Sequence, residues 1–361
     1  MLRVIRGCVV LVVACFALLI QAQDFEAVKR AAEQGDVKAQ NSLGMMYLKG
    51  QGVTQNDAEA VRWWRKAAEQ GYARAQSNLG WAYHIGRGVA KDYDEAMKWY
   101  QKAAEQGNAN AQANLGSHYR FRTHHDVEAA KWYQKAAEQG NVLAQTHLAL
   151  MYELGQGVAK NAAEAMKWYA RAAEQGGAKE QVRLAQIYRM GRLVAQDHAE
   201  AIKWYRRAAE QGDTLALYWL GVEYNDGQGV QDFAEAMKWY RKAAEQQGDG
   251  LSQGLAQYRI GEMYAKGQGV ERSDAEAMKW YVQAAEKGRD EADYRIGEMY
   301  AHGQGGAQNF AEAVKWYQKA ASWNMDARKA LERLAGQGNT DAQKALEALK
   351  AMEEEDICGG D

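Results

Sequence analysis

The pentapeptide Ala-Ala-Glu-Gln-Gly recurs along this chain at a spacing near 36 residues, and this recurrence restricts the possible folds more than any other feature. Identical copies occupy 31–35, 67–71, 103–107, 136–140, 172–176 and 208–212, and degenerate copies occupy 243–248 and 284–288. A fixed period of roughly 20–50 residues is the signature of stacked structural repeats. Residues shared by all copies therefore serve stacking, and function must lie in residues that differ between copies.

One unit, 36–71, contains two helical patterns. Its first half places Leu43 and Tyr47 on one helical face, with Gly44 as a side-chain-free spot where a neighbouring helix can approach closely. Its second half places Trp63 on a face with alanines spaced three and four residues apart. Glycines follow each pattern, as glycine tolerates the left-handed conformation of helix C-caps. The unit is predicted to be a helical hairpin.

Tryptophans mark eight such units. They are Trp63, Trp99, Trp132, Trp168, Trp204, Trp239, Trp280 and Trp316. At helical spacing, Trp99 and Trp168 are expected to be inter-helix core. A leading half-unit at 24–35 and a closing pair of helices at 325–352, where leucines replace the aromatic residues, are suited to capping the array. We therefore expect one solenoid domain over 23–352, followed by a disordered acidic tail over 353–361.

The repeated motif A-Q-x-x-L-G-x-x-Y-x-x-G-x-G-V, followed by E-A-x-x-W-Y-x-K-A-A-E-Q-G, resembles the Sel-one-like repeat family, a relative of the tetratricopeptide repeats. The resemblance covers 24–352 and implies an all-α, right-handed superhelix. Members of this family mostly act as adaptors and scaffolds, often in bacterial envelope, stress or host-contact settings. The chain departs from the pattern by lacking proline, by losing the loop glycines at 121–126, and by an insertion around 247–254.

The first 22 residues have the parts of an export signal. Arg3 and Arg6 precede an apolar run over 8–20, and a short polar exit follows at 21–23. The run is short compared with the roughly 20 residues that span a membrane. We expect a cleaved signal peptide over 1–22 and a periplasmic or secreted protein without a membrane span. The alternatives are a retained anchor and lipidation at Cys15.

Charge and cysteine content exclude two classes of protein. Removing residues 1–22 takes away Arg3 and Arg6 but no acidic residue, so the net charge falls from −2 to about −4. Sequence-independent nucleic-acid binding needs a surplus of clustered basic residues, so no nucleic-acid partner is expected. Only Cys358 remains after cleavage, which rules out an internal disulfide and separates the chain from the cysteine-rich branch of the family.

No pattern predicts catalysis, a cofactor or a metal. His118, His124, His125 and His147 are close in sequence, but no cysteine or acidic pair completes a tetrahedral ligand set. The sequence has no nucleophile elbow, and the glutamate of each pentapeptide recurs too regularly to be catalytic. We therefore predict a protein that is not an enzyme.

The variable positions of the first helices remain. By analogy with tetratricopeptide arrays, these helices line the concave surface of the superhelix, and their exposed non-consensus residues are expected to bind a partner. The predicted residues of the first zone are Met45, Trp81, His84, Arg120, Leu150 and Arg189. Those of the second zone, a tyrosine ladder with acidic neighbours, are Tyr218, Tyr258, Glu262, Tyr294 and Glu298. The alternative is that these tyrosines only pad the packing between first helices.

These observations predict a non-enzymatic scaffold or adaptor of the bacterial envelope that binds a protein or peptide on its concave face. Aromatic side chains favour this interpretation because they dominate the energetics of protein interfaces. Two alternatives stay open. One is a protein that binds or hydrolyses cell-wall peptides or β-lactams, which rests on family analogy alone; the other is a secreted factor that contacts a host cell.

Overall fold

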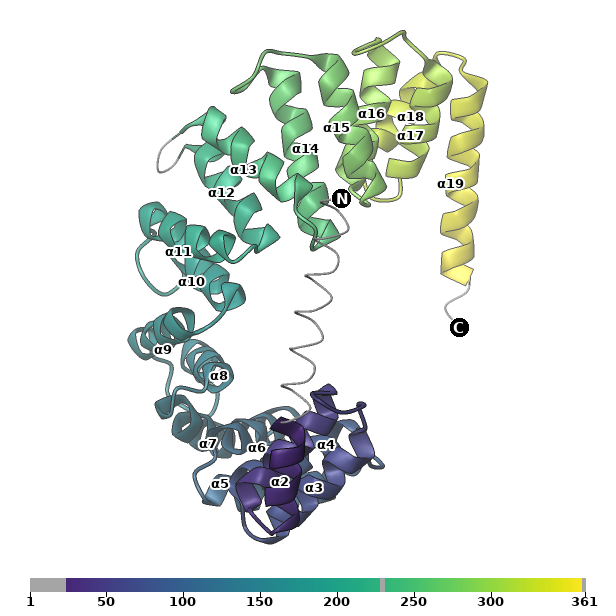
Figure 1. The fold of residues 1–361 in the computed structure, drawn as a ribbon. Coiled ribbons are helices and arrows are strands. Elements are labelled where there is room, and N and C mark those ends of the chain that lie inside the picture. Colours follow the sequence, from purple (N-terminus) through teal and green to yellow (C-terminus); the bar gives the residue numbers. More distant parts are fainter. Residues whose placement is uncertain (1–23, 228–230, 359–361) are drawn as a thin grey trace, which may run out of the picture. The chain divides into compact units, whose positions relative to one another are not determined.

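The computed structural model describes residues 24–227 and 231–358, and every regular element within these ranges is a helix. The helices pack in sequential pairs, which confirms the predicted all-α solenoid of hairpin repeats (Figure 1). The chain divides into two compact units, Met1–Gln175 and Gly176–Asp361, and each is considered by itself. The predicted signal peptide lies outside the described residues.

The first unit begins with a helix at 24–33, and hairpins follow. Their first helices are α2 (Val37–Lys49), α4 (Ala73–Ile85), α6 (Ala109–Phe121) and α8 (Val142–Leu154). Their second helices are α3 (Asp57–Glu69), α5 (Tyr93–Glu105), α7 (Asp126–Glu138) and α9 (Ala162–Gln175). Each predicted hairpin is therefore present, including the one whose loop lacks glycines.

The second unit continues the alternation. Its first helices are α10 (Ala178–Met190), α12 (Thr214–Asp226), α14 (Gly250–Lys266), α16 (Asp290–His302) and α18 (Met325–Gly336). Its second helices are α11 (His198–Glu210), α13 (Phe233–Glu245), α15 (Asp274–Glu286), α17 (Phe310–Ala320) and α19 (Thr340–Cys358). The expected end of the last helix at Met352 is wrong, since α19 continues to Cys358; the added segment begins with glutamates, which are good helix formers.

An aromatic ring on the second helix packs against a glycine on the first helix of the same repeat. A Cβ atom on Gly80 would lie 2.8 Å from Cδ1 of Tyr100, and one on Gly116 would lie 2.7 Å from Cδ1 of Tyr133. Tyr100 is 1% exposed, whereas the preceding Trp99 is 8% exposed. The predicted core role of Trp99 is confirmed, but the deepest anchor of the hairpin is the tyrosine that follows it.

Repeated glutamines hold successive repeats together. Gln76, at the start of α4, donates from Nε2 to the carbonyl oxygen of Ala68 at the end of α3 (3.1 Å). Its own Oε1 accepts from Nε2 of Gln106, which belongs to the pentapeptide of α5 (2.8 Å). Gln76 is buried, so both hydrogen bonds satisfy groups that water cannot reach. The shared residues of the repeat are thus used in stacking, as expected.

In four loops a second glycine, at Gly88, Gly157, Gly269 or Gly305, allows one repeat to rest on the preceding one. Gly157 has φ +67°, and a Cβ atom there would lie 2.1 Å from the carbonyl oxygen of Asp126, at the start of α7. Gly107 also has a positive φ, +86°, but a Cβ atom there would have no neighbouring residue within 4 Å. Substituting Gly107 tests the free-energy cost of the backbone conformation alone. Substituting Gly157 tests that cost together with the cost of a steric clash.

We expect Gly107→Ala to lower the free energy of unfolding by about 1 kcal/mol, because alanine disfavours a left-handed backbone. Gly157→Ala should cost about 1–3 kcal/mol more, because the clash displaces the loop from the preceding repeat. Urea unfolding followed by circular dichroism measures both values. Equal losses in the two variants would contradict the proposed contact between the loop and α7.

Candidate partner-binding face

The first helices of successive repeats form a shared surface within each unit, here called the first-helix face. In the first unit α6 contacts α8, and in the second unit α12 contacts α14. The predicted binding residues lie on these first helices. Their exposure and contacts decide whether they are free to meet a partner.

In the first unit, Trp81 lines a cavity, and Met45 lies beside Asn78, another residue that lines it. Trp81 packs edge-on against Trp64, with ring centroids 6.3 Å apart. Asn78 donates from Nδ2 to Oδ1 of Asn41 (2.9 Å) and lies 4.0 Å from Sδ of Met45. A cavity of about 270 Å³ opens beside Asn78 and Trp81. Both predicted residues are half-buried, so each keeps a part of its surface available.

Arg120, Leu150 and His84 are also half-buried. The guanidinium of Arg120 donates to Oε1 of Gln156 (3.0 Å) and lies 3.4 Å from Nδ1 of His147, so it is held within the first unit. These contacts join consecutive repeats. The first-zone residues of the first unit are therefore partly covered, whereas they were expected to be exposed.

In the second unit each ladder tyrosine packs against the repeated tyrosine of its own hairpin. The ring pairs are Tyr218–Tyr240 (5.9 Å), Tyr258–Tyr281 (5.6 Å) and Tyr294–Tyr317 (5.9 Å). Tyr218 is 5% exposed, so the expectation that it is an exposed residue is wrong. Tyr258 and Tyr294 are half-buried.

The acidic neighbours of the ladder have partners on their own helices. Glu262 is buried and forms ion pairs with Arg259 (2.8 Å) and Lys266 (3.3 Å). Glu298 pairs with Arg295 (3.1 Å) and accepts a hydrogen bond from the hydroxyl of Tyr294 (2.9 Å).

Burial, followed by the Glu298 carboxylate, raises the pKa of Tyr294 to about 12. The ladder is thus a linked network of hydroxyl, guanidinium and carboxylate groups, and Glu262 is not a free acidic site. A cavity of about 210 Å³ lies over this network, between α14 and α16.

A buried charge cluster in the second unit was missed by the sequence analysis. Arg189, which was predicted, lies 2.9 Å from Oε1 of Glu223, and Nδ1 of His198 lies 2.7 Å from Oε2 of the same carboxylate. The Glu223 side chain is only 2% exposed. The guanidinium of Arg189 also lies 4.3 Å from the ring centroid of Trp219. The available signal was an acidic residue at a position that is Met, Ala or Ile in most other repeats.

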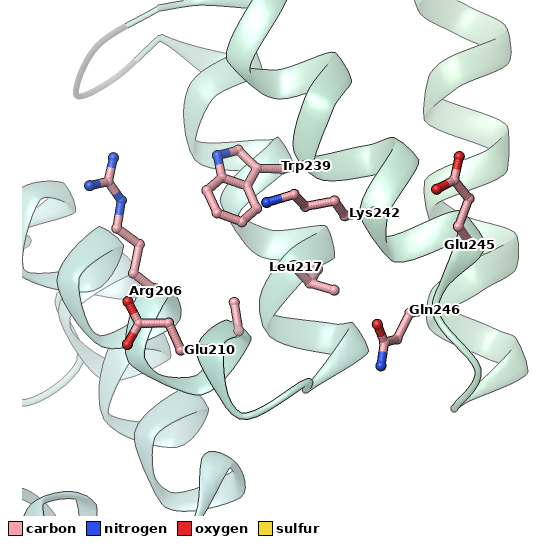
Figure 2. Close-up of a pocket in the computed structure, with 8 residues that line it drawn as sticks. Arg206, Glu210, Leu217, Trp239, Lys242, Glu245 and Gln246 are labelled. Atoms are coloured by element: carbon pink, nitrogen blue, oxygen red, sulfur yellow. The ribbon is translucent and has the colours of Figure 1, made fainter. Parts of the chain in front are cut away.

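A cavity of about 640 Å³ lies away from the predicted residues, between α11, α12 and α13 (Figure 2). Figure 2 shows Trp239 and Lys242 of α13 opposite Arg206 and Glu210 of α11, with Leu217 between them. The Nζ atom of Lys242 lies 4.4 Å from the ring centroid of Trp239. The same Trp–Lys pair recurs in other repeats. This cavity is therefore lined mainly by repeat residues and offers little specificity.

Metal-binding and membrane-spanning features are not found in the described part of the chain. No group of three or more His, Cys, Asp or Glu side chains within 24–227 and 231–358 is placed to hold a metal ion. The ring of His147 stacks on Tyr133 (5.1 Å), whereas His124 and His125 are exposed. Among the described helices, none combines the length and apolarity needed to cross a membrane.

Comparison with known proteins agrees with the repeat register. The profile of the Sel1 repeat family matches residues 37–72, 73–108, 109–141, 142–177, 181–213, 214–248, 254–288 and 290–322. These boundaries coincide with the hairpins described above. No sequence among the curated proteins matches the chain.

Two of the solved structures that match are similar to this chain in both sequence and fold. One is a protective antigen present in uropathogenic Escherichia coli strains, with an SLR fold; it is 33% identical, the match covers 91% of this chain and 78% of that protein, and the TM-score is 0.54. The other is a Sel1 repeat protein from Oxalobacter formigenes; it is 36% identical, with 77% and 80% covered and a TM-score of 0.57.

Proposed function

Because the chain belongs to the Sel1 repeat family, whose repeats generally build scaffolds for protein interactions, we propose that it is a non-enzymatic scaffold of the bacterial envelope that binds a polypeptide on its first-helix face. The observation that carries this proposal is a division of labour among the residues. Repeated glutamines and aromatic residues are used in stacking, whereas Trp81 in the first unit and Tyr258 and Tyr294 in the second, which most repeats lack, stay half-buried on the first helices of their own unit.

Half-buried aromatic side chains are suited to interface contacts. Their rings are already held by neighbouring rings, so binding costs little side-chain entropy, and their remaining surface offers a large contact area. The amide groups of Asn41 and Asn78 and the hydroxyl of Tyr294 add hydrogen-bonding groups beside the rings. This combination fits a polypeptide better than a small apolar ligand.

The proposed location rests on the N-terminal sequence pattern, with 1–22 as a cleaved export signal. One solved relative is described as a protective antigen of uropathogenic bacteria, which favours a secreted, host-contacting role as the second candidate. Fractionation tests the location. Recovery from the periplasm supports the envelope scaffold, and recovery from the culture medium supports the secreted factor.

Affinity capture from a native envelope extract tests the proposed function. Trp81→Ala changes the first unit and Tyr294→Ala changes the second. If these side chains are interface hot spots, each substitution should reduce the binding free energy for the captured partner by about 2 kcal/mol or more, which is roughly thirtyfold in affinity. Lys98→Ala, on a second helix, is the matched control, since its side chain is exposed and paired only with Glu95. Circular dichroism must show equal helicity in all variants.

Two results would contradict this proposal. Capture that is equally strong with Trp81→Ala, Tyr294→Ala and Lys98→Ala would remove the first-helix face from binding. Hydrolysis of a chromogenic β-lactam or a cell-wall peptide by the pure protein would establish an enzyme instead of a scaffold.

A further inference from the structure

A cluster of basic side chains surrounds one tyrosine in the first unit. Tyr93 is the first residue of α5, and its ring centroid lies 5.0 Å from that of His84, 4.8 Å from Nζ of Lys91 and 3.9 Å from Cζ of Arg122. Lys91 and Arg122 are exposed. Within the described residues neither of these two cations takes part in an ion pair.

The electrostatics of this cluster are those of an excess positive charge. Hydrogen bonding by Lys91 and Arg122 lowers the pKa of Tyr93. Burial lowers the pKa of His84, and the charges of Lys91, Arg122 and His118 lower it further. Burial and Arg122 lower the pKa of His118, where Asp94 has the opposite effect. Burial and the charges of Lys91 and Arg122 therefore both disfavour protonation of the cluster's histidines.

In the second unit the equivalent repeat positions include a carboxylate that balances the charge of the basic side chains. Counted from the conserved leucine of each repeat, Arg189, His198 and Glu223 occupy the positions of His84, Tyr93 and His118. There the Glu223 carboxylate lies 2.9 Å from Arg189 and 2.7 Å from His198. In the first unit a histidine replaces this glutamate, so the cations have no internal carboxylate.

The irregular third repeat shapes this site. Its loop lacks the usual glycines, and Arg122 stands where other repeats have glycine, so its side chain reaches over Tyr93. His124 in the same loop has φ +55°, an uncommon conformation for a residue other than glycine. Ile85 follows His84 in the sequence and Phe121 precedes Arg122; both are exposed, at 47% and 56%, and the Phe121 ring lies 5.6 Å from that of His147. The departure from the repeat thus leaves cations without a carboxylate partner and exposed apolar side chains next to them in the sequence.

We propose that the Tyr93 cluster, made of His84, Lys91, Tyr93, His118 and Arg122, binds the carboxylate of an Asp or Glu in a partner polypeptide whose adjacent apolar side chains cover Ile85 and Phe121. The inference rests on the proposed function and specifies the chemistry of the partner. A peptide fits better than an anionic membrane, because Asp94, Asp126 and Glu128 lie on neighbouring helix starts and would repel a surface of anionic headgroups.

Selection of random dodecapeptides displayed on phage against the full chain tests this inference. We expect the selected peptides to combine an acidic residue with adjacent apolar residues. Lys91→Gln/Arg122→Gln should lower the affinity for the selected peptides about tenfold or more. Changing the acidic residue of the peptide to its amide should lower the affinity of the unchanged protein by a similar factor. Changing the peptide acid to its amide should have little effect on binding to Lys91→Gln/Arg122→Gln, because the peptide change and the protein change remove the same carboxylate–cation interaction.

Two further variants sharpen the test. Arg74→Gln/Lys160→Gln removes the same net charge from exposed sites and should leave peptide affinity within about twofold. His118→Glu supplies the internal carboxylate that Glu223 provides in the second unit, and it should abolish the preference for acidic peptides.

Peptide binding should also raise the pKa of His84, because a carboxylate favours the charged imidazole. Binding is therefore coupled to proton uptake and should strengthen as the pH falls toward the ordinary histidine pKa, about 6.5. Nuclear magnetic resonance titration of His84 with and without the selected peptide measures this shift.

Three outcomes would overturn the inference. They are selected peptides without acidic residues, acidic peptides that bind Lys91→Gln/Arg122→Gln unchanged, and binding to phosphatidylglycerol vesicles in place of peptides. If peptides bind but respond to Trp81→Ala or Tyr294→Ala and not to the cluster variants, the inference fails while the proposed scaffold function stands. If the native capture experiment fails as well, both are wrong.

Discussion

Tyr100→Ala is expected to lower the free energy of unfolding by about 3–5 kcal/mol, the typical cost of deleting a buried aromatic ring. The ring is 1% exposed and fills the space above Gly80, where it holds α4 against α5. Its loss leaves a cavity that the rigid hairpin cannot close. Urea unfolding followed by far-ultraviolet circular dichroism measures the change.

Two control variants test whether the loss of stability is specific to the buried Tyr100 ring. They ask whether a larger ring, or an aromatic ring at another position, has the same effect. Trp99→Ala removes a larger ring that is more exposed and lies under Lys102, so we expect a smaller loss than for Tyr100→Ala. Phe121→Ala removes an exposed ring and should change stability by about 0.5 kcal/mol or less. A larger loss for Trp99→Ala than for Tyr100→Ala would make the tryptophan the anchor of the hairpin.

Glu223→Ala is the second large effect, with an expected loss of about 3–5 kcal/mol, because it leaves Arg189 and His198 beside a buried site without their carboxylate. Glu235→Ala, which breaks a more exposed pair with Lys238, should cost only about 0.2–1 kcal/mol. Denaturant unfolding of the full chain compares the two variants directly.

A double variant tests whether the loss comes from the stranded charge. Other repeats have methionine at the position of Glu223, so Arg189→Leu/Glu223→Met replaces the ion pair with apolar side chains that the repeat tolerates. This variant should recover most of the stability that Glu223→Ala loses. Equal losses for the single and double variants would mean that the carboxylate stabilises the fold through other contacts.

The fold could be predicted from the sequence because the residues that make each packing contact recur in most repeats. The Leu-Gly pair, the Trp-Tyr pair and the loop glycines recur at fixed spacing, and the structure uses them in the same way in successive hairpins. The end of α19 was misplaced because the repeat matches end at residue 322, so no repeated feature marks where α19 stops.

The candidate site could be predicted only in part. Position on a first helix follows from the repeat, but exposure does not, and Tyr218 is buried because its ring packs against Tyr240 and Trp219. The contacts of Glu223 could not be predicted from the sequence, because they bring together residues from three helices of two repeats. The Tyr93 cluster was hidden in the same way, since Arg122 reaches back to the preceding repeat.

Hydroxyl-radical footprinting of the full chain with its captured partner tests whether the first-helix face binds that partner, because the radicals oxidise aromatic and sulfur-containing side chains wherever they stay exposed. We expect the partner to protect Met45, Trp81, Tyr258 and Tyr294 on the first helices. Trp204, Trp239 and Trp316 on the second helices should keep their oxidation rates. Protection confined to the second-helix tryptophans would contradict binding on the first-helix face.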